Sequence, residues 1–150
     1  MNIPFHLITI LPLCYFLYPQ IGLISTIFLF LGGWAFDIDH YLYCIVKHKN
    51  FSLKDCYNFH HPWAKEKDLL HIFHTIEFYI LVLIIGLFVK EIFYLFIGLL
   101  YHMTFDFIMI LYVKYYKKDH EKTDNCRTRS LISWLIRHYS PSKSTNLKTL

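Results

Sequence analysis

Charge is what this sequence has least of, and two long stretches account for the shortage. Residues 7–36 contain no charged side chain, and residues 78–113 contain only Lys90, Glu91 and Asp106. Charged residues make up 17% of the chain, against about 25% in a typical soluble domain. Because a water-soluble fold could not easily bury both stretches, the composition predicts an integral membrane protein.

Two further absences exclude other classes of protein. No C-x-x-C pair occurs among Cys14, Cys44, Cys56 and Cys126, so the spacing indicates neither a disulfide framework nor a zinc ribbon. The net charge of +4 is weak and scattered, which argues against nucleic acid as a partner. Lysine and arginine lie outside the apolar stretches, where they suit contact with anionic membrane lipid.

The apolar pattern predicts an all-α helical bundle in two hairpins. The expected hydrophobic helices cover residues 5–18, 21–36, 69–89 and 92–113. Pro19 and Gln20 interrupt the first pair, Lys90 and Glu91 mark the turn of the second, and Pro12 should kink the first helix. Residues 1–113 then form a membrane-embedded metal-binding domain, and residues 114–150 a basic tail. Within that tail, residues 131–139 are expected to form a short interfacial helix anchored by Trp134.

Helix length and lysine placement predict how the bundle lies in the membrane. The first two helices have about 14 and 16 residues, fewer than the roughly 20 that a spanning helix needs, so their hairpin need not cross the whole bilayer. Lysines gather between the second and third helices and after the fourth, at positions 47, 49, 54, 65, 67, 114, 117 and 118. The positive-inside rule therefore predicts that both termini and the middle segment face the cytoplasm from the inner membrane.

Histidines and aspartates occur at the ends of the expected helices. They are His6 in the first, Asp37, Asp39 and His40 after the second, His71 and His74 in the third, and His102 and Asp106 in the fourth. In an up-down-up-down bundle these positions lie toward the same side. His102 and Asp106 are four residues apart and share a helical face, as do His71 and His74 at a spacing of three.

Imidazole and carboxylate groups together are typical ligands of zinc, manganese or iron, with zinc the default for hydrolysis. Eight candidates exceed what one tetrahedral ion requires, which suggests two ions or one ion with supporting carboxylates. A carboxylate such as that of Asp106 inside a spanning helix costs about 2.5–3.5 kcal/mol on insertion scales and usually marks function. Glu77 could orient His74 or form a buried hydrogen bond, whereas His60 and His61 are expected in a solvated loop.

Four short motifs in order resemble the small membrane-bound metal-dependent hydrolases of bacteria and archaea. They are Phe5-His6-Leu7-Ile8, Phe36-Asp37-Ile38-Asp39-His40, His74-Thr75 and His102-Met103-Thr104-Phe105-Asp106. Together they cover about residues 4–113. The resemblance implies an all-α fold distantly similar to zinc-dependent phospholipases C and fungal single-strand nucleases, which hydrolyse phosphoesters with clustered zinc ions. Many family members carry an H-R-G run before the Ser/Thr-linked histidine, where this chain has His71-Ile72-Phe73-His74 and no arginine.

The sequence therefore predicts a metal-dependent hydrolase at the membrane, acting on a phosphoester such as a lipid head group. The expected ligands are His6, Asp37, His40, His74, His102 and Asp106. Asp39 is assigned as general base or bridging carboxylate, and His71 as ligand or leaving-group acid. The alternative is a non-catalytic membrane protein that binds or transports a metal ion. A bis-histidine haem protein is disfavoured, because haem ligation gives the carboxylates no role.

Overall fold

The computed structural model describes residues 3–60, 69–116 and 127–139, and these residues are mostly helical. The long elements are α1 (Ile3–Trp34), α2 (Ile38–His48), α3 (Leu53–His60), α4 (Ile76–Gly86), α5 (Lys90–Leu111) and α7 (Leu131–Tyr139). Short elements join them: η1 (Ala35–Asp37), β1 (Leu69–Leu70), η2 (Ile72–His74), the π-helical η3 (Tyr112–Tyr116) and β2 (Arg127–Thr128). The all-α prediction is confirmed, whereas a membrane bundle of four helices stays a prediction.

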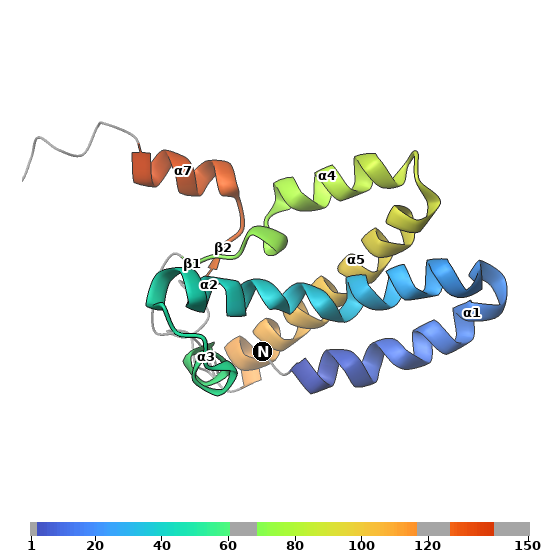
Figure 1. Cartoon of the computed structure of the whole chain (residues 1–150), viewed down its shortest axis with the longest axis horizontal. Helices are drawn as coiled ribbons and strands as arrows, with labels where there is room; N and C mark the ends of the chain where they lie inside the picture. The colour runs from blue at the N-terminus through green and yellow to red at the C-terminus, as the bar shows by residue number, and fades with distance from the viewer. Residues whose placement is uncertain (1–2, 61–68, 117–126, 140–150) are drawn as a thin grey trace, which may run out of the picture.

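α1 is a helical hairpin rather than one straight rod. Its backbone leaves helical geometry at Gly22, which has φ +79°. Glycine tolerates this conformation because it has no Cβ. The two arms turn back at this point (Figure 1). A hairpin was expected here, but its break comes after Pro19 and Gln20 rather than at them, and helical dihedrals continue through Pro12.

The second arm of α1 continues much further than the sequence pattern suggested. After the short turn η1, α2 extends the run to His48, and Lys49 ends it with φ +53°. α3 then packs beside α2, and Cys44 and Cys56 form a disulfide between them. The spacing of the cysteines did not predict this bond. His60 is the last residue of α3, and His61 lies outside the described residues.

The expected helix over residues 69–89 is wrong in its first third. Residues 69–74 contain β1, then His71, and then the single turn η2. Thr75 follows, and α4 begins only at Ile76. The Thr75 side chain accepts a hydrogen bond from the backbone of Phe78, which caps the helix. With 11 residues, α4 is about 16 Å long, so it is too short to span a membrane. α4 ends at Gly86. The turn was expected at Lys90 and Glu91, but these residues are the first two of α5.

α1 and α5 cross closely at Gly32 and Gly98. Gly32 faces the Leu95 carbonyl and the Gly98 Cα, so a side chain at either glycine would meet backbone. Small residues at a crossing allow two helices to approach closely. Tyr101 adds a hydrogen bond from its hydroxyl to the carbonyl of Thr9, 2.8 Å away. The long helix α5 is thereby fixed against both arms of α1.

The two ends of the molecule differ in surface. Both hairpin turns lie at one end, and α2, α3 and α7 lie toward the other (Figure 1). Apolar side chains on the turns and helix faces are exposed, including Phe88 at 84% and Tyr15 at 77%. Two helical runs, Phe5–His48 and Lys90–Tyr116, have the length and composition to cross a membrane. This is weak support for membrane association by itself, and the exposed apolar surface adds to it.

Candidate metal centre

All eight histidines and aspartates singled out from the sequence come together between the helices. Their side chains are 0% to 11% exposed. His6 comes from the first turn of α1, Asp37 from η1, Asp39 and His40 from the first turn of α2, His71 and His74 from the segment before α4, and His102 and Asp106 from α5. Five histidines and three carboxylates therefore share one buried volume, where unpaired charge is costly.

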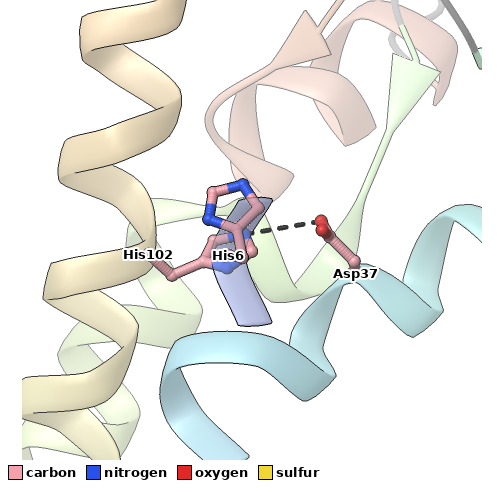
Figure 2. A group of neighbouring side chains, drawn as sticks. All are labelled: His6, Asp37 and His102. Atoms are coloured by element: carbon pink, nitrogen blue, oxygen red, sulfur yellow. Dashed lines mark ion pairs between the residues drawn. The ribbon is translucent and has the colours of Figure 1, made fainter. Parts of the chain in front are cut away.

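His102 is held in a defined orientation by the helix crossing. Its Nδ1 lies 3.2 Å from the Gly33 carbonyl oxygen. Because a carbonyl oxygen only accepts hydrogen bonds, Nδ1 carries a proton and donates it to Gly33. Nε2 then faces the site, 3.4 Å from the Oδ1 of Asp37. Figure 2 marks this contact, which is an ion pair only when the imidazole is doubly protonated, and shows the ring of His6 stacked on His102, at a centroid distance of 4.2 Å.

Asp39 orients two further histidines. Its Oδ1 accepts from the Nδ1 of His40 and its Oδ2 from the Nδ1 of His74, each at 2.8 Å. A carboxylate that accepts from one ring nitrogen fixes the other nitrogen toward the metal in many metal sites. Both oxygens of Asp39 are thus engaged in positioning imidazoles. This arrangement favours a supporting role for Asp39, and the general base or bridging carboxylate expected from the sequence stays a prediction.

The imidazoles of His74 and His102 face each other through their Nε2 atoms. His74 Nε2 lies 3.3 Å from His102 Nε2. Two nitrogens bound to one tetrahedral zinc at about 2.0–2.1 Å would be about 3.3–3.4 Å apart. Asp106 Oδ2 lies 3.8 Å and 3.9 Å from these nitrogens. Asp37 Oδ1 lies 3.4 Å from His102 Nε2 and 3.8 Å from His74 Nε2. Each of these two carboxylate oxygens therefore lies within 4 Å of both imidazole nitrogens.

Four groups of three side chains in the described residues have ligand atoms within 4.8 Å of one another. They are His6/Asp37/His102, Asp37/His40/His74, Asp39/His40/His71 and His74/His102/Asp106. Among the described residues, the two carboxylate oxygens of Asp37 have no hydrogen-bond partner, and the same holds for the Nδ1 of His6. A buried carboxylate without a donor is costly, and a bound cation would satisfy it. The donor set and this unsatisfied carboxylate both fit a divalent metal ion.

Sequence reasoning missed two contributors to the site and assigned Glu77 a partner that it does not have. The Gly33 carbonyl, which orients His102, has no side-chain signal at all. Thr75 was noted only as the residue after His74, whereas its hydroxyl donates to the Ile72 carbonyl at 2.8 Å and so closes the turn that carries His74. Glu77 is not a partner of His74, because its carboxylate binds the start of α7 instead. The contacts of Gly33 with His102 and of Glu77 with Ser130 join residues distant in sequence, so local pattern could not reveal them.

Comparison of this chain with protein-family models, with curated proteins and with solved structures finds no match in any of the three.

Proposed function

We propose that this chain is a membrane-bound metal-dependent hydrolase that acts on phosphoesters such as lipid head groups. One observation carries the proposal: two imidazoles with fixed tautomers present Nε2 atoms 3.3 Å apart, beside the carboxylates of Asp37 and Asp106. A shared proton could satisfy the two nitrogens alone. It would add one positive charge to a volume that holds three buried aspartates, whereas each divalent ion adds two.

The expected ligands are the six residues named from the sequence, with Asp39 holding His40 and His74 in place. Zinc is the expected metal because imidazole and carboxylate suit it, and manganese and iron remain alternatives. The overlap of the four groups at Asp37, His40, His74 and His102 supports a capacity of one to three ions per chain. A bound divalent ion supplies Lewis acidity to a phosphoester oxygen and to a water molecule. His71 stays the proposed donor to the leaving group.

The exposed apolar surface favours a membrane as the environment and its lipids as the source of substrate. We place the site end and both termini on the cytoplasmic side of the inner membrane, following the lysine distribution. The disulfide between Cys44 and Cys56 weighs against this orientation, because disulfides persist in oxidising compartments. Labelling of Cys126 with a membrane-impermeant thiol reagent tests the orientation. Reaction in intact cells would indicate the opposite orientation, with Cys126 outside the cytoplasm.

A second function, non-catalytic metal binding or transport, is favoured by the depth of the cluster. His71 and His102 are 1% and 0% exposed in their side chains, so a phosphoester would need an opening to reach them. The two functions share the metal site and differ in turnover. Hydrolysis of a chromogenic phosphodiester in detergent micelles, dependent on added zinc, separates them, since a storage or transport protein would show binding without turnover.

Metal binding itself is tested by titrating zinc into chelator-treated, detergent-purified protein. We expect one to three ions per chain for the parent. Asp37→Asn should lower the affinity of the tightest ion about tenfold or more, since loss even of a supporting group has that effect. Asp55→Asn is the matched control, because Asp55 is an exposed carboxylate on α3. A parent protein that binds no zinc would refute the proposal.

A further inference from the structure

Two of the eight candidate ligands lie on a segment with little regular structure of its own. His71 has an extended backbone and precedes the single turn η2, which ends at His74. The other six lie in α1, η1, α2 and α5, which are parts of long helical runs. The histidine segment, residues 69–77, therefore needs support from elsewhere to hold two imidazoles within a few tenths of an ångström of their positions.

That support comes from residues 127–132, here called the strap, and it reaches the histidine segment on both sides. Before His71, β1 pairs in parallel with β2, with Leu69 opposite Arg127 and Leu70 opposite Thr128. After His74, the backbone nitrogen of Ile76 donates to the carbonyl of Arg129 at 2.9 Å. Two backbone attachments to the same distant piece of chain therefore flank the two histidines, and Figure 1 shows β1 and β2 side by side.

Glu77 is the side chain that holds the strap in this position. Its Oε1 accepts from the Ser130 hydroxyl at 2.6 Å and from the backbone nitrogen of Ile132 at 3.2 Å, and its Oε2 accepts from the backbone nitrogen of Leu131 at 3.0 Å. These nitrogens belong to the first turn of α7, whose donors have no partner within the helix. A carboxylate from α4 therefore caps α7, and the favourable charge–dipole contact strengthens the attachment.

We propose that Glu77 is a positioning residue for the metal centre, and that it acts through the strap on His71 and His74. This inference rests on the proposed function, because it assumes that these histidines bind metal. Glu77 touches neither the metal volume nor any ligand in the described contacts. Its effect is to dock residues 127–132, which fix the backbone on either side of the two histidines and so preorganise their imidazoles.

The experiment compares three full-length variants with the parent in detergent. Glu77→Ala removes all three contacts to the strap. Glu77→Gln keeps one acceptor oxygen and removes the charge. Glu91→Ala is the matched control, because Glu91 also lies in the first turn of a helix, α5, at the opposite end of α4–α5 from the site. Zinc affinity is measured by chelator competition, and the visible spectrum of the cobalt-substituted protein reports the geometry around the metal.

We expect Glu77→Ala to lower zinc affinity about tenfold or more, the range seen for outer partners of metal ligands, and to change the cobalt spectrum. Glu77→Gln should recover part of both, and Glu91→Ala should match the parent. Equal zinc affinity and an unchanged cobalt spectrum in Glu77→Ala, in a parent that binds zinc, would overturn the inference and leave the proposed function intact. A parent that binds no zinc would overturn both.

A second variant guards against a folding defect in Glu77→Ala. Ser130→Ala removes the hydroxyl that donates to Glu77 and accepts from the backbone nitrogen of Ser133, and it leaves every residue of the bundle unchanged. We expect a several-fold loss of zinc affinity with the helical circular dichroism of the parent. Ser133→Ala, an exposed serine one turn along α7, is its control. Parent-like affinity in Ser130→Ala together with a misfolded Glu77→Ala would count against the strap, because the attachment would then serve folding alone.

Discussion

The two halves of the metal centre are supported in different ways. His6, Asp37, His102 and Asp106 lie on long helical runs, where the backbone of each helix fixes the side chain. His71 and His74 lie on a short segment whose position depends on residues more than 50 places further along the chain. The difference separates what a helix provides by itself from what tertiary contacts must add. It also predicts that damage to the two halves will have different sizes and different signatures.

The largest effect is expected where the two long helices cross. A Cβ at Gly98 would meet the carbonyl oxygen of Leu29, which is backbone and cannot move without shifting α1. Gly98→Ala should therefore destabilise the protein by about 3 kcal/mol, the upper part of the usual overpacking range. It should also lower zinc affinity, because His102 lies one turn further along α5. Thermal unfolding by circular dichroism and a zinc titration measure the two losses.

Gly22→Ala is the comparison for that variant. Gly22 lies at the hairpin turn with nothing within 4 Å of a new Cβ, so only its positive φ is strained. Its φ of +79° with ψ of 172° lies in a region that almost only glycine occupies, so the expected cost is about 1–3 kcal/mol, with zinc affinity unchanged. The ligands on long helical runs (His6, Asp37, His102 and Asp106) are here called the helix-borne half of the site. If Gly98→Ala were as stable as the parent, or if Gly22→Ala lost zinc affinity to the same degree, the helix crossing would not be what positions this half.

The next effect separates a ligand from a support. Asp106→Asn keeps the shape of the side chain and removes the charge, and Asp106 lies 3.3 Å from His6 Nε2. If Asp106 binds metal, the variant should lose about tenfold or more in affinity. Its thermal stability with zinc present should fall, since bound metal stabilises the folded state by mass action. Without zinc it should be at least as stable as the parent, because a buried charge has been removed.

Asp55→Asn provides the control for that reversal of sign. Its carboxylate is exposed, so the substitution should leave zinc affinity and both stabilities close to those of the parent. Unchanged metal content and unchanged stability of Asp106→Asn in both conditions would remove Asp106 from the site. Because a packing defect lowers stability with or without metal, only a ligand role gives opposite signs in the two measurements.

The sequence predicted the helix-borne half better than the other half, for a physical reason. α5 was expected over residues 92–113 and is observed from Lys90 to Leu111, because its apolar run and its i, i+4 pair are local features. The expected meeting of polar helix ends followed from hairpin topology. Residues 69–75 look helical in isolation, since Leu69, Leu70, Ile72 and Phe73 are apolar. Their conformation is decided instead by pairing with residues 127–128 and by the Thr75 cap.

The smallest expected effect is a pH-dependent loosening of the segment-borne half. The hydrogen bond from Ser130, with those from the first amides of α7, lowers the pKa of Glu77 to about 2 from a usual value of 4.5. A carboxyl group with a lowered pKa in the folded state stabilises that state fully above its unfolded pKa. Docking of the strap should therefore be constant above about pH 4.5 and should be lost as the pH falls toward about 2. The helix-borne half has no such contact with Glu77 among the described residues.

Hydrogen exchange of the backbone amides of Leu131 and Ile132, corrected for the intrinsic rate at each pH, measures this docking. Both amides donate to Glu77, so their protection in the parent should decrease between pH 4.5 and pH 2. Amides of α5 around Leu99, a fully buried residue, should show no transition at the same point. Glu77→Gln has no charge to lose, so its protection at Leu131 should be lower at neutral pH and flat across the same range. Protection at Leu131 that is independent of pH in the parent would show that the charge of Glu77 does not hold α7, and that the histidine segment is supported by its backbone contacts with residues 127–129.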